Sequence, residues 1–306
     1  MKKLAALMSV LALCLGMIGT GTITARADSV EVKPYIAFGA DLTSSQKNKV
    51  MELLGVTKEE LADYETITVT NQDEHKNLDS YLDKSVIGTK ALSSVKIEEA
   101  DAGSGVTVTT HNISFVTEEM YTNALVTAGI NDATVTVAAP FKISGTAALV
   151  GAMKAYETMT GEAVDSDSAD AANNELVETS NLAKDVGADK AAEFVASLKE
   201  KVVSGDLSSE EDILKAVDET AQEVGITLTD SQKQSMTALM KKISGLDLDT
   251  DSLKNQAKDI YNKLPEGVEI VHSCSTGYGE ALIKAALILD EGEVETVSHY
   301  YAAAFF

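Results

Sequence analysis

The hydrophobic pattern of the chain changes its period once, and this change limits the possible folds more than any other feature. Between residue 30 and about residue 160, runs that alternate apolar and polar residues, such as "ETITVT" and "ATVTVAAP", stand between segments with helical spacing. From about 176 to 264 only helical spacing remains. A period of two is typical of strands and a period near 3.6 of helices. The pattern therefore predicts an α+β or α/β N-terminal domain followed by an all-α helical region.

The first region is predicted to alternate strands and helices. Thr43 and Gln46 form a capping-box pattern at the start of its first helix. The segment "SSVKIEEADAGSGVTVTTHNISFV" predicts a β-hairpin that turns at residues 103–105. A helix is expected over 117–129, and Pro140 is expected to close the strand that follows it.

The second region is expected to begin after an acidic stretch of small residues, 162–175, which is interpreted as a linker or as a solvated helix start. A capping box is predicted at Ser208 and Glu211. The similar segments "LTSSQKNKVMELL" and "LTDSQKQSMTALM" predict two helices that begin with the same cap. Turns between the helices of this region are predicted at four glycines: Gly187, Gly205, Gly225 and Gly245.

The start of the chain predicts a signal peptide over residues 1–27. Two lysines precede an apolar run over residues 4–18, and the letters "ARA" end at Ala27, where cleavage is expected. Cys14 raises the alternative of a lipoprotein, but Leu13 stands where a lipobox needs a small residue. No second apolar run is long enough to span a membrane. We therefore expect a secreted or surface-held mature protein without a transmembrane segment.

Charge restricts the partners of this protein. Removal of the leader lowers the number of basic residues from 25 to 22 against 48 acidic ones, which gives a net charge of about −26. Arg26 in the leader is the only arginine, and arginine is the usual residue for bidentate recognition of phosphate. These features argue against nucleic acid and phosphorylated ligands. The mature chain keeps one cysteine, Cys274, so it has no internal disulfide and one unpaired thiol.

Few residues qualify as site candidates. Ser144, Gly145 and Thr146 follow a predicted strand and open a predicted helix. Such a helix start can bind an anion, but a simple N-cap at Ser144 is the favoured interpretation. His75 and His111 are isolated from spaced acids and cysteines, which favours surface or strand-end roles over zinc binding or catalysis. No catalytic residue and no cofactor is predicted.

Acidic clusters give no specific metal site. Asp247, Asp249 and Asp251 alternate like the first ligands of a calcium loop. The sixth position of that loop is Ser252 instead of glycine, and Lys258 occupies the place of the bidentate acid. A second set fails in a similar way: Asp165, Asp167 and Asp170.

Residues 30 to about 265 resemble a family of secreted bacterial proteins known as domain-of-unknown-function family 1002. The resemblance lies in "FGADLTSSQKNKVMELLGV", in "YTNALVTAGINDATVTVAAPFKISGTAALVGAMKAYE" and in "LTDSQKQSMTALMKKISGLDLD". It implies a Firmicute-type source and a location outside the cytoplasm. It implies no activity and no functional residues.

The end of the chain resembles a different family. "STGYGEALIKAALILDEGEVETVSHYYAAAFF" is similar to part of the activators of 2-hydroxyacyl-CoA dehydratases, which are ATPases with an iron–sulfur cluster. The glycine-rich nucleotide loops are missing, and Cys274 alone cannot hold a cluster. We therefore expect residues 266–306 to be a foreign-looking fragment without ATPase activity. Within it, "ALIKAALIL" is expected to form an apolar helix.

Together these features predict a secreted bacterial protein with a mixed domain over 28–161 and a helical domain over 176–265. Its expected role is non-enzymatic binding of an extracellular or cell-envelope partner. Two alternatives remain open. One is a secreted hydrolase with a site around Ser144 or near His111, and the other is a surface protein that depends on cations held by the acidic clusters. The partner and the oligomeric state are not predicted.

Overall fold

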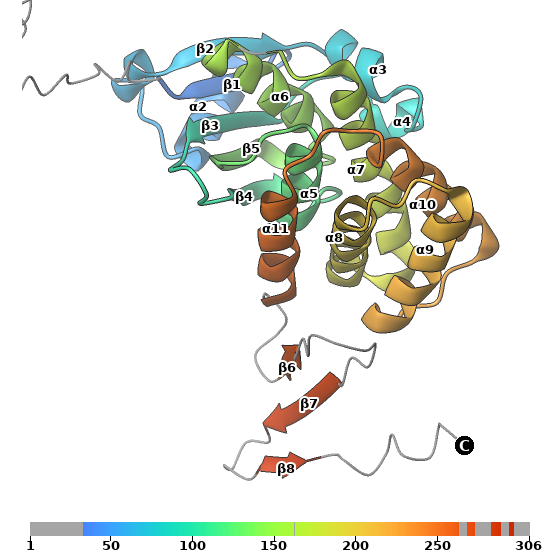
Figure 1. Cartoon of the computed structure of the whole chain (residues 1–306). Helices are drawn as coiled ribbons and strands as arrows, with labels where there is room; N and C mark the ends of the chain where they lie inside the picture. Colours follow the sequence, from blue (N-terminus) through green and yellow to red (C-terminus); the bar gives the residue numbers. More distant parts are fainter. Residues whose placement is uncertain (1–32, 162, 263–267, 273–282, 289–293, 297–306) are drawn as a thin grey trace, which may run out of the picture. The chain divides into compact units, whose positions relative to one another are not determined.

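The computed structural model describes residues 33–161, 163–262, 268–272, 283–288 and 294–296 (Figure 1). The predicted signal peptide, its cleavage point after Ala27 and the unpaired Cys274 lie outside these residues. From residue 33 the chain forms a five-stranded sheet with helices, and from residue 166 to 262 it is a run of helices. The predicted fold class, a mixed α/β region followed by an all-α region, is confirmed.

The sheet has one strand that opposes the others. Its order is β2-β1-β3-β5-β4, and its strands are β1 (Tyr35–Gly39), β2 (Glu65–Val69), β3 (Ser94–Glu99), β4 (Val106–Ile113) and β5 (Ala133–Ile143). β1 and β2 are parallel, as are β4 and β5, while β3 is antiparallel to both of its neighbours. The carboxyl ends of β1, β2, β4 and β5 therefore meet at one edge of the sheet.

The predicted hairpin of β3 and β4 is wrong, because β5 lies between these two strands and pairs with each of them. Val135 of β5 is opposite Ile97 of β3 on one side and Val108 of β4 on the other. β5 is buried at Ala133, Val135 and the run 137–139. A strand with buried side chains on both faces is most stable at an inner position, and this preference outweighs closeness along the sequence.

β5 also continues beyond Pro140, which was expected to end it. Pairing with β3 reaches only to Ala138, and the register with β4 shifts between His111 and Ile113. Pro140 therefore lies where the ladder is already irregular. Its missing N–H group breaks no regular ladder bond there, which is the usual condition for proline in a strand.

Helices cover both faces of the sheet (Figure 1). α5 (Glu118–Thr127) and α6 (Thr146–Thr160) pack on one face with Val95, Val108 and Val137. α2 (Ser44–Leu53) packs on the other face with Ile36 and Phe38. Strands place successive side chains on opposite faces, so the alternation in these strands builds two separate apolar layers.

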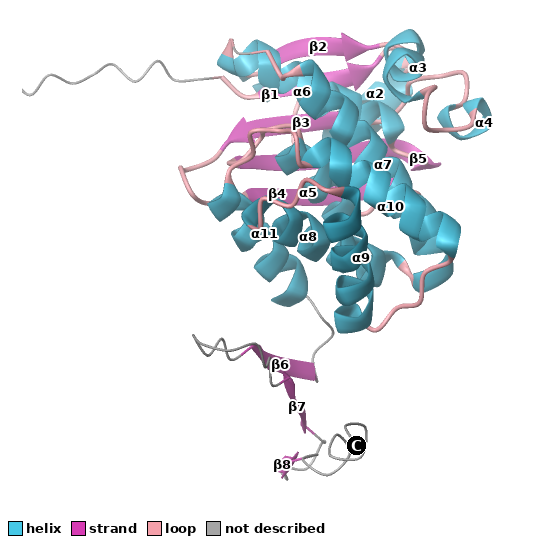
Figure 2. Ribbon diagram, turned by 45° about the vertical axis from the view of Figure 1, so that its right-hand side comes forward, coloured by secondary structure: helices cyan, strands magenta, loops and turns pink. Residues whose placement is uncertain are grey.

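The helical region consists of α7 (Ser166–Val186), α8 (Ala188–Ser204), α9 (Glu210–Val224), α10 (Asp230–Ile243) and α11 (Thr250–Asn262) (Figure 2). α7 contributes to two cores: Leu176 and Val177 pack in the core under the sheet, whereas Ala171 and Leu182 pack among the helices. Most of the segment expected as a linker or solvated helix start is the first half of α7. Because α7 contributes to both cores, the sheet region and the helical region are packed together.

Two capping predictions are confirmed and two are wrong. The side chain of Thr43 caps α2 with Gln46 in a capping box, and the same arrangement opens α10. The expected box at Ser208 is displaced by one residue, because Ser209 accepts the N–H of Asp212 at the start of α9. Ser144 does not cap α6, because Gly145 occupies the N-cap position in a left-handed conformation.

Short elements complete the fold: η1 (Glu60–Asp63), α3 (Asn71–Leu78), α4 (Lys84–Ile87), β6 (Val268–His272), β7 (Ile283–Ile288) and β8 (Val294–Thr296). The apolar helix expected around "ALIKAALIL" is wrong, since β7 is a strand that pairs antiparallel with β6 and β8. A short apolar run fits a buried helix and a strand equally well, and here pairing with two neighbours decides for the strand. Across the described ranges, no helix combines the length and the apolar character needed to span a membrane.

Candidate functional site

A cavity of about 320 Å³ lies at the sheet edge where the carboxyl ends of the parallel strands meet. We name it the strand-end pocket, and its walls include Glu74, Lys90, Leu92, Ser93, Ser144 and Thr146. Glu74 lies on α3, which follows β2, while Ser93 precedes β3 and Ser144 follows β5. In open α/β sheets, crevices at the carboxyl ends of strands are the usual binding sites.

The turn from β5 into α6 requires glycine. Gly145 has φ +95°, and a Cβ atom at this position would lie 2.5 Å from the Tyr121 hydroxyl oxygen and 2.7 Å from Ile113 Cγ2. The buried Tyr121 hydroxyl donates a hydrogen bond of 2.6 Å to the Gly145 carbonyl. This turn leaves Ser144 at the wall of the strand-end pocket, where its Oγ lies 3.3 Å from Thr146 Oγ1. Ser144 and Thr146 are therefore brought together, with Gly145 as the backbone support.

Glu74 is the residue that sequence reasoning missed. Thr146 donates a hydrogen bond of 2.8 Å to Glu74 Oε1, and the Asn71 side chain donates one of 3.2 Å to Oε2. Glu74 is only 2% exposed. Burial raises the pKa of its carboxyl, and the hydrogen bonds from Thr146 and Asn71 oppose this rise only in part. The strand-end pocket thus contains a carboxyl group that is protonated more readily than an exposed glutamate.

A sequence signal for this position does exist. Thr70 caps α3 in a capping box with Asp73, directly after β2 ends. Glu74 is the next residue, so it stands in the first turns of a helix at the carboxyl edge of a parallel strand. The polar run around Glu74 gives no sign of its burial, because packing by α6 cannot be read from the local pattern.

His75 supports one wall of the strand-end pocket. Its Nδ1 lies 2.6 Å from Asp79 Oδ1 and its Nε2 lies 3.2 Å from the carbonyl oxygen of Gly88, which lines the pocket. The hydrogen bond to Asp79 raises the pKa of His75. Both nitrogens donate when the ring is protonated, so the imidazole links α3 to the segment that carries Lys90.

His111 lies elsewhere. It is paired with Ala138 in the sheet, and Ala138 belongs to the core on the α2 face. Within the described ranges no hydrogen bond joins His111 to Ser144, whose hydroxyl group lies beside that of Thr146. The geometry therefore does not assemble these two residues into a nucleophile and its base.

The acidic clusters cap the starts of helices or form ion pairs between them. Asp165 accepts the N–H groups of Asp167 and Ser168 at the start of α7, and Asp249 accepts that of Ser252 at the start of α11. Asp170 contacts Lys242 Nζ at 2.6 Å. In the part of the chain that the structure describes, no group of three or more His, Cys, Asp or Glu side chains is placed to hold a metal ion.

A second buried carboxyl lies among the helices. Glu175 of α7 and Lys199 of α8 form a fully buried ion pair with a distance of 2.9 Å. Lys199 also donates to Thr127 Oγ1 and to the carbonyl of Asn123, each at 2.9 Å. Burial raises the pKa of Glu175 and lowers that of Lys199, and their mutual attraction opposes both shifts. We name these four residues the Lys199 cluster.

The comparisons with known proteins agree with the resemblance of residues 30–265. A family model described as "Protein of unknown function (DUF1002)" matches residues 38–260. The "Uncharacterized protein YpuA" of Bacillus subtilis (strain 168) is 42% identical over 244 residues, which are 79% of this chain and 83% of that protein. No solved structure matches the chain significantly. The residues that this family model matches include all those of the strand-end pocket and of the Lys199 cluster. Because the model matches more than half of the sequence, the chain belongs to the DUF1002 family.

Proposed function

We propose that this protein is a secreted, non-enzymatic binding protein of the extracellular space or cell envelope, and that it holds its partner at the strand-end pocket. The observation that carries this proposal is the fixed position of the polar groups there. Thr146 and Asn71 hold both oxygens of Glu74, and Tyr121 holds the turn beside Ser144. Groups already held in place lose little freedom on binding, which favours affinity.

The pocket suggests the kind of group it accepts. Leu92, Ile87 and Ile143 supply apolar walls, while Glu74, Ser144 and Thr146 supply the polar side. A mostly apolar lining with a few convergent polar groups is typical of small-molecule sites. A partner that inserts one small group with an apolar body and a hydrogen-bonding end fits this lining. Secretion is supported by the leader-like first 27 residues.

The test is native mass spectrometry of the protein produced with its own leader in a bacterial host. Thr89 is exposed and lines the strand-end pocket, so Thr89→Trp should block the pocket without disturbing the core. Lys58→Trp places the same side chain at an exposed residue outside the pocket. After incubation with cell-wall and membrane extracts, we expect one added mass on the wild type and on Lys58→Trp, and none on Thr89→Trp. An added mass that Thr89→Trp retains would refute the proposal, as would no added mass on any of the three.

The same spectra report whether the chain begins at Asp28.

A hydrolase is the second candidate, because a carboxyl with a raised pKa stands beside two hydroxyl groups in one pocket. A neutral carboxyl of this kind can act as a general acid. Activity on peptide, glycan or ester substrates should then disappear in Glu74→Gln and in Ser144→Ala. His111→Ala should retain it, since His111 lies outside the pocket. Equal loss in His111→Ala would place the chemistry elsewhere.

We also propose that residues 268–306 are a fragment of an activator-like sequence and add no ATPase activity. The family match ends at residue 260, before this segment begins. Hydrolysis of ATP by the purified protein that disappears when residues 268–306 are deleted would refute this proposal.

A further inference from the structure

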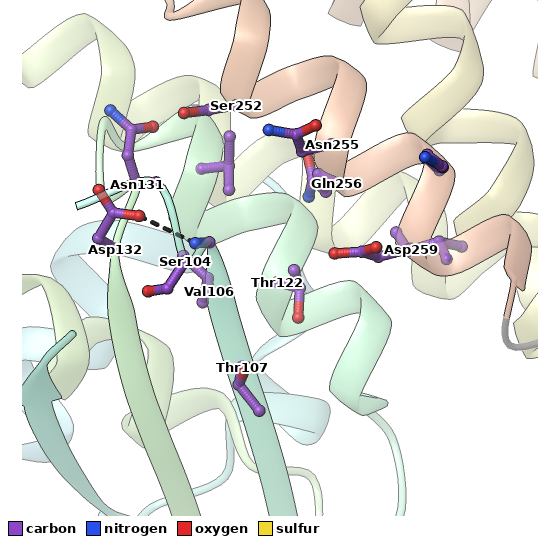
Figure 3. Close-up of a pocket in the computed structure, with 15 residues that line it drawn as sticks. Ser104, Val106, Thr107, Thr122, Asn131, Asp132, Ser252, Asn255, Gln256 and Asp259 are labelled. Carbon is purple, nitrogen blue, oxygen red and sulfur yellow. Dashed lines mark hydrogen bonds between the residues drawn. The ribbon is translucent and has the colours of Figure 1, made fainter. Parts of the chain in front are cut away.

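A second cavity lies at the opposite end of the strands from the strand-end pocket. It has a volume of about 540 Å³ and lies between α11, α5, the turn that joins β3 to β4, and the turn before β5 (Figure 3). We name it the α11 cavity. Its walls come from the turn after β3, the amino end of β4, the turn before β5, α5 and α11, and it shares no residue with the strand-end pocket.

Gln256 of α11 fixes one wall of this cavity. Its Nε2 donates a hydrogen bond of 2.7 Å to Asn123 Oδ1, and Asn123 Nδ2 donates one of 3.1 Å to the carbonyl of Ala192. These bonds determine which end of the Gln256 amide faces Asn123. Gln256 is 6% exposed and lines the cavity, and its Oε1 has no hydrogen-bond partner among the described residues. Because this oxygen is itself buried, Gln256 holds α11 in place at the cavity through Asn123, and a ligand would meet the more exposed groups of the lining.

Two carboxylates in the lining act only as acceptors when they are ionised. Asp132 and Asp259 stand on opposite walls, and Figure 3 shows Asp259 extending from α11 toward the strands. Asp132 Oδ1 accepts the N–H of Gly105 at 2.9 Å, which holds that carboxylate in place. Lys258 is the one cationic side chain in the lining as described. An anionic ligand would meet two carboxylates there, and like charges repel.

The remaining lining is suited to a compact ligand with many hydroxyl groups. Asn131, Asn255, Ser104, Ser252 and Thr122 add neutral hydrogen-bonding groups, and Val106, Val126 and Ile260 add apolar surface. Sugar rings present both hydroxyl groups and C–H faces. The volume falls within the range of about 300–1,000 Å³ that small-molecule sites occupy.

We propose that the α11 cavity binds a small polyhydroxyl ligand that is neutral or carries one positive charge, of the class of monosaccharides and amino sugars. The hydroxyl groups donate to the carboxylates of Asp132 and Asp259. An ammonium group, where present, contacts one of these carboxylates. A sugar acid is rejected by the same two groups.

The first experiment titrates the full chain with glucosamine, glucose and glucuronate, with isothermal calorimetry and ligand-observed saturation-transfer NMR as readouts. Glucosamine and glucose should bind, with glucosamine the tighter of the two, and glucuronate should not bind. Absence of binding by both glucosamine and glucose at millimolar concentrations would overturn the proposal. Equal binding of all three probes would overturn it as well, because it would show no use of the carboxylates.

Variants then locate the binding. Asp259→Asn should weaken glucosamine binding by about tenfold, which corresponds to the loss of one charge-assisted hydrogen bond. Asp251→Asn is the matched control on the same helix, since Asp251 is exposed and outside the cavity lining. Ser104→Trp, at the exposed tip of the β3–β4 turn, should abolish binding by filling the entrance. Unchanged affinity in both Asp259→Asn and Ser104→Trp would refute the α11 cavity as the site, and neither variant alters a buried residue.

Discussion

The Lys199 cluster and the strand-end pocket each bury a glutamate, but they neutralise it in different ways. Glu175 has an ammonium group at 2.9 Å and a hydroxyl donor in Thr127. Among the described residues, Glu74 accepts hydrogen bonds from the neutral side chains of Thr146 and Asn71, and the charge of His75 adds a weaker attraction. The first carboxyl is enclosed by α5, α7 and α8, whereas the second lines a cavity of about 320 Å³.

This difference separates a structural role from a functional one. A buried charge with a matched partner and satisfied hydrogen bonds holds elements together. Burial without a directly hydrogen-bonded cation raises the pKa of the Glu74 carboxyl, so Glu74 takes up a proton more readily than an exposed glutamate and can then donate a hydrogen bond to a group that enters the cavity. We therefore assign packing of the helical region to Glu175, and the proposed recognition at the sheet edge involves Glu74.

The largest effect is expected from Lys199→Met. This change leaves Glu175 buried without its cation, which should lower the free energy of unfolding by about 3–5 kcal/mol. Urea denaturation at pH 7 measures it. The loss should shrink as pH falls, because protonation of Glu175 removes the unpaired charge.

The matched control is the double variant Lys199→Met with Glu175→Leu, which removes both charges. Its stability should lie within about 2 kcal/mol of the wild type, since apolar replacements of buried ion pairs are often neutral. A double variant as unstable as the single one would mean that lost packing, and not the unpaired charge, causes the loss of unfolding free energy.

Thr146→Val should have an intermediate effect. It removes the 2.8 Å hydrogen bond to Glu74 Oε1 at nearly constant volume, so it should cost about 1–3 kcal/mol in the free energy of unfolding. Thr158→Val on the exposed side of the same helix is the control, with an expected cost below about 0.5 kcal/mol. An equal loss of unfolding free energy in the two variants would show that the hydrogen bond from Thr146 to Glu74 does not contribute to stability.

The smallest effect is expected from Glu74→Gln, and it should depend on pH. The folded pKa of Glu74 lies above its ordinary value of 4.5, so its carboxyl favours folding below that value and loses this contribution as pH rises through the folded pKa. The glutamine side chain of the variant does not titrate. The variant should therefore gain stability relative to the wild type between pH 4 and pH 7, within about 1 kcal/mol.

Denaturation of both proteins at several pH values measures this difference. Glu59→Gln, at an exposed position outside the strand-end pocket, should show no such trend. A Glu74→Gln variant that loses stability relative to the wild type as pH rises would reverse the assigned direction and remove the basis for a neutral carboxyl at the site.

The local predictions succeeded where neighbouring residues decide the structure. The capping box of Thr43 and Gln46 closes over three residues, and its copy at Thr229 and Gln232 opens α10 in the same way. Predictions failed where distant segments compete. β5 separates β3 from β4 although it follows both in sequence, and Gly145 replaces Ser144 at the α6 cap because Tyr121 and Ile113 crowd that turn.

The amino-acid sequence by itself determined the fold class, because periodicity and capping depend on residues within one or two turns of each other. It also determined the strongly acidic character of the protein and singled out the turn at residues 144–146. Only the tertiary structure decided which acids matter. Glu74 and Glu175 look like ordinary helix-surface acids in the sequence, and packing by α6 and α8 removes them from water. Desolvation is a property of the assembled layers, so no local pattern could reveal it.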